Sequence, residues 1–578
     1  MKRNTFVVLT AGMALDIVVS TRAQILHNGV GYIPSQYRVD WSQAGLLPEN
    51  RSGLLPETPI TADHMFAIDP SGDSDQQIAT ALQRVRSTGG TWVIYFLGGV
   101  HRLSSSIVLR QANGDHNIIF RGAGAGATIL EFDLGRDGVL FDVAGSEGSP
   151  SSITADIQKD DESFLSGGSF AYNDWVRIYE DGRWVDGEHG FVGQITQIDG
   201  TISGGYTIKD AASKTYQTSL NLLARMVFPI TNIGIENLTI RCTEYEKSTE
   251  EQWGSGISIK FDHAVNCWVK GVRSWNTPRH HITIDFSSHV EVSGSYLYDA
   301  CYHGGQSYGY GVVMSYGSTN CLIENNIFEH LRHSMGIGIG ANCNVFAFNF
   351  STDQYATSGG IGYQAADLCL HGRYSYANLY EENLIEWIEA DGTHGEHGPF
   401  NVFVRNKTYD YTDGEWRNIK LKDAPFTSVL GCELWDGNDD AIEIEDGPYP
   451  IFDGYGIHNS VMRDHEYFQG NPGARAEATN GDVSYYYSST PDFMQGMPFP
   501  SIGPRAPGYP TPSQDIPAHV RFSSGPLTYL PDPFPLPESS NYEILTAGAT
   551  LTKVYSEEEW TFLAPQSPDR LLLFRWVA

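Results

Sequence analysis

The stretches NCLIENNIFEH (320–330) and NCNVFAFNFS (342–351) decide the fold, because each is a short apolar run built around an asparagine. Their central asparagines, Asn326 and Asn349, lie about 23 residues apart. Comparable runs follow one another along the middle of the chain, centred on Asn237, Gly271, Gly294, Asn383, Asn406 and Gly431. The differences in residue number between successive centres are 34, 23, 32, 23, 34, 23 and 25. The chain therefore repeats a unit of about 23 residues, and about ten residues lengthen some of the units.

A unit of this length is too short to enclose a core of its own. Two or three short strands per unit, stacked strand on strand at about 4.8 Å, would bury one continuous apolar column. Alternating runs such as HITIDF (281–286) and MGIGIG (335–340) supply the strands. Asn or Gly at a fixed position suits either a turn with positive φ or a ladder of side-chain amides. The repeat predicts an all-β, right-handed parallel β-helix, and its period is too short for the blades of a β-propeller.

A helix is expected upstream, over 73–90. The sequence DSDQQIATALQRVRSTGG has helical periodicity at Ile78, Leu82 and Val85, and it begins at Asp or Ser and ends at a glycine pair. The following TWVIYFLGGVHRL (91–103) is predicted to be the first strand. Such a helix would cover the open end of the solenoid, where apolar surface and strand edges would otherwise be exposed.

The segment 73–109 and the two asparagine-centred coils resemble the pectate-lyase-like superfamily of secreted β-helix proteins, which includes polysaccharide lyases and glycoside hydrolases. The resemblance covers roughly residues 65–470 as architecture. One departure is Leu97, where members often carry proline before the glycine. The catalytic motif of no named lyase or hydrolase family is matched. The resemblance implies a secreted protein that acts on polysaccharides, and it leaves the sugar open.

The composition changes along the chain and predicts six segments. Lys2 and Arg3 precede an apolar stretch that ends near Ala23, which is typical of a secretory signal, although Asp16 interrupts it. The predicted segments are a signal peptide (1–23), an N-terminal extension (24–64), the N-terminal cap with the first coils (65–154), a small β insertion (155–228), the coils that carry an active-site groove (229–465), and a Pro/Gly-rich extension with a terminal segment (466–578). A secreted or periplasmic location follows.

The formal charge is 37 − 69 = −32, which disfavours nucleic acid and anionic membranes as partners. After the N-terminus no stretch of about 18 uninterrupted apolar residues occurs, so no membrane span is expected. The expected partner is an extracellular polysaccharide, and an oligomer is possible.

Seven cysteines are present, and no CxxC motif occurs among them. The spacing between several of them is close to the repeat length. Buried free thiols stacked along the solenoid are therefore favoured over disulfides, although an exported protein leaves disulfides open.

An acid followed by a histidine returns four times, in DACYHG (299–304), EHLRHS (329–334), DLCLHG (367–372) and DGTHG (391–395). Stacking of coils should gather these groups along one groove. Asp367 and Asp391 are separated by about one coil, so their carboxylates are expected to face each other. Such a pair could supply the acid and the nucleophile or base of glycoside hydrolysis, since close carboxylates raise one pKa.

Histidines in the groove could orient the acids or act as bases, arginines could hold sulfate or carboxylate groups, and aromatic rings could stack on sugars. The candidate catalytic residues are Asp367, Asp391, Asp299, His333, His371 and His394, with Glu386 and Glu389 in reserve. The candidate substrate-binding residues are Arg332, Arg373, Tyr308, Tyr310, His303, Glu329 and Trp387, with Tyr374 as a further stacking candidate.

A lyase would use the same groove for β-elimination, with Arg332 or calcium neutralising a uronate and His333 or Tyr310 as base. The groove is expected to be rich in carboxylates and poor in lysine, which favours hydrolysis of an anionic glycan over elimination. A non-catalytic adhesin or glycan-binding β-helix is the second alternative. The acid–histidine stretches also admit a purely structural interpretation, because Asp before a Gly-rich turn commonly caps backbone amides.

No cofactor is certain. The acid–histidine stretches contain residue types that bind divalent metals, but no HExxH motif or regular histidine spacing indicates a catalytic zinc, so no metal ligands are assigned. Calcium is possible at the acidic stretch ELWDGNDDAIEIEDG (433–447), although this stretch lacks the EF-hand pattern.

Overall fold

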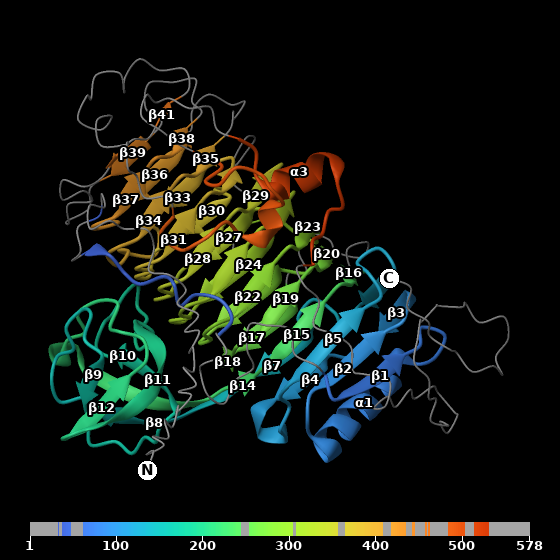
Figure 1. The fold of residues 1–578 in the computed structure, drawn as a ribbon, viewed down its shortest axis with the longest axis horizontal. Helices are drawn as coiled ribbons and strands as arrows, with labels where there is room; N and C mark the ends of the chain where they lie inside the picture. The colour runs from blue at the N-terminus through green and yellow to red at the C-terminus, as the bar shows by residue number, and fades with distance from the viewer. Residues whose placement is uncertain are drawn as a thin grey trace, which may run out of the picture.

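The computed structural model describes residues 33, 37–47, 62–243, 254–304, 308–356, 365–408, 418–434, 442–445, 457–458, 461–462, 484–502 and 514–530. These residues form a right-handed parallel β-helix, as the repeat predicts, with a small antiparallel sheet at its side (Figure 1). The described residues contain two α-helices, α1 (Ser74–Thr88) and α3 (Pro517–Ser524). Neither is long and apolar enough to cross a bilayer.

Each coil contributes one strand to each of three parallel sheets, here numbered sheets 1 to 3. Sheet 1 has 12 strands in the order β1 (His64–Ile68), β2 (Trp92–Phe96), β5 (Ile118–Gly122), β15 (Ile233–Glu236), β19 (Trp268–Lys270), β22 (Glu291–Ser293), β25 (Leu322–Glu324), β28 (Val345–Ala347), β31 (Leu379–Glu381), β34 (Val402–Val404), β37 (Ser428–Leu430) and β40 (Ile457–His458).

Sheet 2 has 11 strands in the order β3 (Gly99–Leu103), β6 (Thr128–Phe132), β16 (Thr239–Cys242), β20 (Arg273–Thr277), β23 (Tyr296–Ala300), β26 (Ile327–Glu329), β29 (Phe350–Thr352), β32 (Leu384–Ile385), β35 (Lys407–Thr408), β38 (Glu433–Leu434) and β41 (Val461–Met462). Sheet 3 has ten strands in the order β4 (Ile107–Arg110), β7 (Val139–Ala144), β17 (Ile257–Asp262), β21 (His280–Asp285), β24 (Tyr310–Ser315), β27 (His333–Ile337), β30 (Leu368–Leu370), β33 (Ile388–Ala390), β36 (Ile419–Lys422) and β39 (Ile442–Glu445).

The core is a column of inward-facing side chains that stack in register. In sheet 1, Ile323 pairs with Phe346, which pairs with Tyr380, which pairs with Phe403. The rings of Phe346 and Tyr380 stack at 5.3 Å between centroids, and those of Tyr380 and Phe403 at 4.8 Å. All four side chains are fully buried, which stabilises the stack by about 1.5–3 kcal/mol for each large apolar side chain.

Asparagine side chains form a ladder at the turn from sheet 1 to sheet 2. The amides of Asn326, Asn349, Asn383 and Asn406 donate each to the next, at 3.1, 3.0 and 2.9 Å. Each also donates to a backbone carbonyl, so the polar groups of these fully buried side chains are satisfied. The residue before each ladder asparagine has positive φ, and Gly271, Gly294 and Gly431 occupy that preceding position in other coils. The centres of the sequence repeats therefore fall on two adjacent structural positions. The asparagines named above occupy the position of the amide ladder, and the glycines occupy the position with positive φ just before it.

Helix α1 closes the first end of the column (Figure 1). Asp73 caps it by accepting a hydrogen bond from the backbone N–H of Gln76 at 3.0 Å, and Gly89 ends it. Ile78, Leu82 and Val85 are buried against the first coil, as their periodicity predicts. The predicted first strand needs correction: β1 precedes the helix, and residues 91–103 hold two strands, β2 and β3, in two different sheets.

The added residues of the longer coils lie in the connections from sheet 2 to sheet 3. These connections run from Ala300 to Tyr310 and from Thr352 to Leu368, whereas Glu329 to His333 is short. The lengthened connections therefore all lead into the edge of sheet 3 at which its strands begin.

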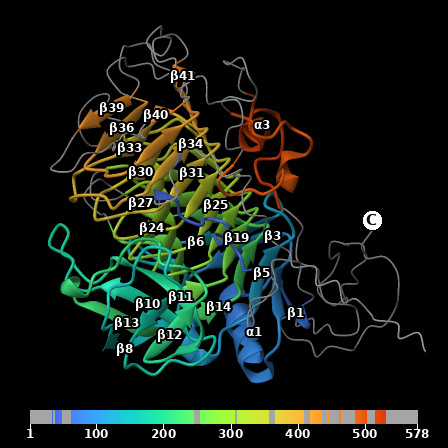
Figure 2. The same cartoon turned by 60° about the vertical axis from the view of Figure 1, so that its left-hand side comes forward.

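The antiparallel sheet at the side of the β-helix is an insertion between β7 and β14 (Ile230–Thr231), and the latter pairs with β18 (Ala264–Val265). It begins at Ser146, before the predicted start at 155. Figure 2 shows its strands grouped beside the β-helix. Its six strands, in spatial order, are β8 (Ser146–Ser152), β13 (Leu222–Phe228), β10 (Trp175–Glu180), β11 (Gly193–Ile202), β12 (Gly205–Ile208) and β9 (Ser163–Leu165). It docks on the turns that lead from sheet 3 back to sheet 1, where Tyr216 and Tyr376 share a hydrogen bond of 2.9 Å.

Segments from both termini pack on the outside of sheets 1 and 2. Trp41 is fully buried and donates to the carbonyl of Ala377 at 2.7 Å. Residues 484–502 and helix α3 form a second apolar cluster with Phe348 and Phe350. The predicted signal peptide lies outside the described residues, as does most of both predicted extensions.

All seven cysteines are free, and six of them are buried. The preference for free thiols over disulfides is confirmed.

Replacing Asn349 with alanine should lower stability measurably. The change removes the acceptor of two donors of Asn326 in the core and one hydrogen bond to the carbonyl of Ile323. The expected loss is about 2–4 kcal/mol in the free energy of unfolding. The midpoint of thermal unfolding checks it against Asn113→Ala, at the exposed end of a short 3-10 helix (Gln111–Asn113), which should change little. Equal midpoints for both variants would contradict a stabilising role of the ladder.

Candidate functional site: a groove on the outer face of sheet 3

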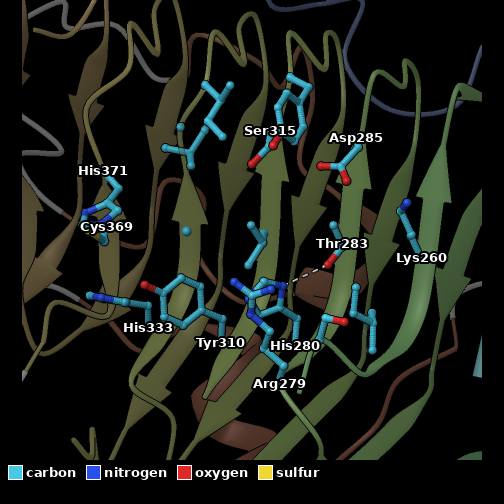
Figure 3. A pocket seen from close by; sticks show the side chains of 18 of the residues that line it. Lys260, Arg279, His280, Thr283, Asp285, Tyr310, Ser315, His333, Cys369 and His371 are labelled. Atoms are coloured by element: carbon cyan, nitrogen blue, oxygen red, sulfur yellow. Dashed lines mark hydrogen bonds between the residues drawn. The ribbon is translucent and has the colours of Figure 1, made fainter. Parts of the chain in front are cut away.

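A groove with a cavity volume of about 460 Å³ crosses the outer face of sheet 3 (Figure 3). Strands β7, β17, β21, β24, β27 and β30 supply its floor, and the turns after β24, β27, β30 and β33 close one end. The floor is low at its centre, where Val313 and Gly336 stand side by side in register. The groove is therefore an extended trough that crosses several coils.

Cations line the groove although the chain as a whole is strongly acidic. Lys260, Arg279 and Arg373 face it, together with four histidines, His280, His333, His371 and His394. The acids among the lining residues are Asp137 and Asp285. The groove is poor in lysine as expected, with Lys260 the one lysine among the described lining residues, but the expectation that carboxylates dominate it is wrong. The charge of the groove therefore no longer favours hydrolysis over elimination. A local balance of this sign suits an anionic ligand.

Two aspartates stand in register on neighbouring strands, and one of them, Asp285, lines the groove. Asp262 on β17 pairs with Asp285 on β21. Burial disfavours ionisation of Asp262, but hydrogen bonds from His263 (2.6 Å) and Lys260 (3.0 Å) outweigh it and hold the pKa of Asp262 below its usual range. Burial and the neighbouring Asp262 charge raise the pKa of Asp285 to about 7. One Asp285 oxygen is buried without a hydrogen-bond partner.

A histidine–tyrosine–histidine row lies at the strand starts. His280, Tyr310 and His333 are in register across β21, β24 and β27. Tyr310 stacks on His280 at 5.2 Å between centroids and meets the edge of His333 at 4.7 Å. His333 Nδ1 donates to the carbonyl of Ala366 at 2.7 Å, which leaves the lone pair on Nε2. Burial lowers the pKa of His333 to about 3, so the ring is neutral at ordinary pH. Arg332 lies beside this row, with its guanidinium 5.7 Å from the Tyr310 ring centroid.

Side chains of the insertion hold groove residues in place at the end near β30 and β33. Asp186 accepts a hydrogen bond from His394 at 2.7 Å, and Arg373 pairs with Asp186 at 3.2 Å and Glu188 at 3.1 Å. Trp184, in the same hairpin, is 64% exposed and stacks on His189 at 4.3 Å. Arg373 and His394 are thus fixed in place, with an exposed aromatic ring nearby in the hairpin.

His371 and Asp391 are brought together by stacking of adjacent coils. His371 follows β30 and Asp391 follows β33, and the two form a hydrogen bond of 2.5 Å through His371 Nδ1. Burial opposes ionisation of Asp391, but hydrogen bonds from His371 and the backbone N–H of Thr393 lower its pKa to about 2. Asp391 is therefore a charged carboxylate at every ordinary pH.

Asp367 does not face the groove. It is fully buried, contacts Ser351, and accepts hydrogen bonds from the backbone N–H groups of Glu386 (2.8 Å) and Trp387 (3.1 Å). Burial raises the pKa of both Asp367 and Glu386. The structural alternative, in which an aspartate caps backbone amides, describes this residue.

The expected pairing of Asp367 with Asp391 is wrong because the coil between them is short. Leu368 pairs with Ile388, since sheet 2 connects to β33 through only two residues, Glu386 and Trp387. Asp367 therefore precedes its strand and Asp391 follows its own, at opposite edges of sheet 3. The separation of Asp367 and Asp391 in sequence is close to the average period, but the two residues do not occupy equivalent positions in their coils.

Other candidates lie at the corner between sheets 2 and 3. Asp299 approaches His303 at 3.4 Å, His303 donates to the carbonyl of His330 at 2.9 Å, and Glu329 contacts the hydroxyl of Tyr296. Trp387 is buried and donates to Gln354 at 3.1 Å. These residues do not line the groove. Neither do Tyr308, near Arg279, Tyr374, beneath Arg183, or Glu389, next to Cys369 in register.

The structure thus places His333, His371, His394, Arg373 and Tyr310 along the groove, and separates Asp299, Glu329 and Asp367 from it. The sequence analysis missed Lys260, Asp262, Arg279, His280 and Asp285. A signal for the two aspartates was present, because they end the alternating runs ISIKFD (257–262) and HITID (281–285). The difference between their numbers, 285 − 262 = 23, equals the base period.

Much of the acidic stretch 433–447 lies outside the described residues, so the possible calcium site there is untested.

The chain matches no protein-family model and no curated protein sequence. Among solved structures, tailspike gp61 of Pseudomonas phage phi297 matches with a TM-score of 0.50 and 11% identity over 66% of this chain and 62% of its own. Tailspike gp49 of Pseudomonas phage LKA1 matches with a TM-score of 0.43 and 14% identity over 62% and 57%. The catalytic domain of a GH87 alpha-1,3-glucanase matches at 0.34 and 12% over 70% and 58%.

The chain spans less than two thirds of the length of each of these three proteins. At such identities, the similarity to the phi297 tailspike shows a shared fold, the right-handed parallel β-helix.

Proposed function

We propose that this protein cleaves an anionic polysaccharide in the groove over sheet 3, by hydrolysis of a glycosidic bond. The single observation that carries the proposal is the Asp262–Asp285 pair, whose pKa values are displaced in opposite directions. A glycosidase needs one protonated carboxyl group as acid and one carboxylate as nucleophile or base, and such a pair assigns the two roles. Asp285 is the acid and Asp262 is the carboxylate.

The spacing of the pair supports a retaining reaction. Neighbouring strands lie about 4.8 Å apart, close to the carboxyl separation of about 5–5.5 Å used by retaining glycosidases. Lys260 and His263 hold Asp262 ionised, which suits a nucleophile. Asp285 would protonate the leaving oxygen and then, as a carboxylate, activate the water that releases the sugar.

The rest of the groove supports an anionic ligand. Lys260, Arg279 and Arg373 could bind carboxylate or sulfate groups along the chain of sugars, and Tyr310 and Tyr316 could stack on rings. A secreted or periplasmic protein meeting an extracellular polysaccharide is part of this proposal.

β-Elimination from a uronate is the second candidate, and the state of His333 favours it. The neutral ring has its lone pair on Nε2, beside Tyr310 and near Arg332. His333 could then remove the proton, Tyr310 could protonate the leaving oxygen, and Arg332 could neutralise the carboxylate.

The two reactions give different products from a polyuronate or a sulfated glycan. Both release new reducing ends, but only elimination leaves an unsaturated uronate that absorbs ultraviolet light. Under hydrolysis, Asp285→Asn and Asp262→Asn should each lower kcat/KM by about 10²- to 10⁴-fold, while His333→Ala keeps substantial activity. Melting temperatures near that of the wild type serve as the control for folding. Ultraviolet-absorbing products, or full activity in both aspartate variants, would refute the hydrolytic assignment.

The pH dependence of kcat/KM tests the acid assignment separately. Asp285 must be protonated to act as acid, so activity should be present below its pKa of about 7 and fall as pH rises through that value. The other limb should fall as pH drops through the lowered pKa of Asp262. A profile that stays flat from pH 6 to pH 9 would contradict the acid role of Asp285.

Gly336 offers a way to block the groove without straining the backbone. A Cβ atom there would meet the Tyr310 ring at 3.5 Å, which is ordinary contact, and a leucine side chain would stand in the groove. Gly336→Leu should weaken polysaccharide binding at least about tenfold, roughly 1.4 kcal/mol, at a melting temperature close to that of the wild type. Gly126→Leu, at an exposed turn with open space, is the matched control in a glycan-binding titration. Unchanged binding by Gly336→Leu would place the ligand elsewhere.

A further inference from the structure

Three potential metal ligands converge at the end of the groove farthest from Asp285. Cys369 Sγ lies 3.9 Å from His371 Nδ1 and 3.8 Å from Asp391 Oδ2, and the latter two atoms are 2.5 Å apart. Cys369 and His371 leave the same face of the chain because they are two residues apart at β30 (Figure 3). Asp391 joins them from the next coil, since Leu370 pairs with Ala390.

The arrangement does not fit a cysteine nucleophile with a histidine base. In such a triad, the carboxylate and the nucleophile contact opposite nitrogens of the imidazole ring, which relays the proton. Here both Sγ and the carboxylate oxygen approach Nδ1. Three donors around one point form the arrangement of a coordination site.

We propose that Cys369, His371 and Asp391 bind a divalent ion of the zinc class. Zinc takes sulfur at about 2.3 Å and nitrogen or oxygen at about 2.0–2.2 Å, so a tetrahedral site separates its ligand atoms by about 3.3–3.6 Å. The two distances to sulfur are already close to this range. The hydrogen bond between His371 and Asp391 opens by about 0.8 Å when the ion replaces the shared proton. A thiolate ligand selects zinc or cobalt over calcium and magnesium, which prefer oxygen.

A second acid–histidine cluster shows what distinguishes this one. Asp299, His303 and His330 also lie within coordinating distance of one another. However, His303 Nε2 donates to the carbonyl of His330, and His330 Nδ1 bonds to Asp353 at 2.8 Å. These nitrogens are committed elsewhere, and no sulfur is present in this cluster as the structure describes it. The Cys369 cluster is therefore the better candidate of the two.

Three protein ligands leave a fourth position for water or a ligand oxygen. Cys369 and His371 line the groove, so this position opens toward the polysaccharide. His394 packs edge-on against His371 at 4.5 Å, and its hydrogen bond to Asp186 keeps it beside the site. The bound ion would hold a carboxylate, sulfate or hydroxyl oxygen of the glycan, an extension that rests on the proposed function.

Cobalt(II) added to the full-length, metal-free protein tests the site. A thiolate-bound tetrahedral cobalt gives a near-ultraviolet charge-transfer band and intense visible bands, and elemental analysis gives the stoichiometry. We expect one cobalt per chain with both signals, and equal displacement by zinc. The charge-transfer band should disappear in Cys369→Ser, and the visible bands should weaken or disappear in Asp391→Asn. Cys301→Ser, which changes a partly buried thiol outside the cluster, should bind like the wild type.

The proposal is overturned if the wild-type protein shows no thiolate band, or if the band persists in Cys369→Ser. If Cys369→Ser folds poorly, Asp391→Asn provides an independent test, because this substitution is nearly isosteric. A normal cobalt spectrum in Asp391→Asn also overturns the site. The spectra do not depend on catalysis. Asp285→Asn should therefore bind cobalt normally, so failure of the metal site and failure of the proposed hydrolysis are separate results.

Discussion

Strand-on-strand hydrogen bonding between successive coils is the constraint on which the rest of the structure depends. Because the strands are parallel and in register, a side chain's position in its coil fixes which neighbours it has above and below. The asparagine ladder pins this register at the turn from sheet 1 to sheet 2, in the interior where no water competes. A slip of one residue would turn Phe346 and Tyr380 out of the core column to the outer face of sheet 1. The same register fixes the relative positions of the side chains that line the groove.

The same constraint explains which parts of the molecule could be predicted from the sequence. The spacing of Asn326 and Asn349 reveals the repeat length directly. The periodicity of Ile78, Leu82 and Val85 likewise reveals the helix that closes the column. Both features are predictable because the signals are local and repetitive. The site depends on how each coil departs from the period. Asp367 and Asp391 looked equivalent because their separation is close to one period, but the two-residue connection before β33 moved them to opposite edges of sheet 3. Asp262 and Asp285 lie in coils of regular length, so the 23-residue period alone places them in register.

The net charge of the whole chain differs from the local charge in the groove. The net charge of −32 describes the whole surface, whereas the residues that line the groove include three cations, Lys260, Arg279 and Arg373, and two acids. Two of these cations also form ion pairs beside the groove, Lys260 with Asp262 and Arg373 with Asp186 and Glu188. The acidic surface would repel a polyanion at long range, and screening at physiological salt confines that repulsion to about 8 Å. Inside the groove, the local cations decide the interaction. The net charge therefore disfavours nucleic acid as a partner, but it could not indicate which charges line the groove.

The antiparallel insertion leaves and rejoins the β-helix at a single point, because Ser146 and Phe228 are paired partners on β8 and β13. The coil stack passes from β7 to β17 by direct hydrogen bonding, whatever the length of chain between them. The hairpin of the insertion nevertheless fixes Arg373 and His394 at the end of the groove. The insertion can therefore diverge in sequence as a separate module, which would change the side chains that hold this end of the groove while the solenoid itself stays unchanged.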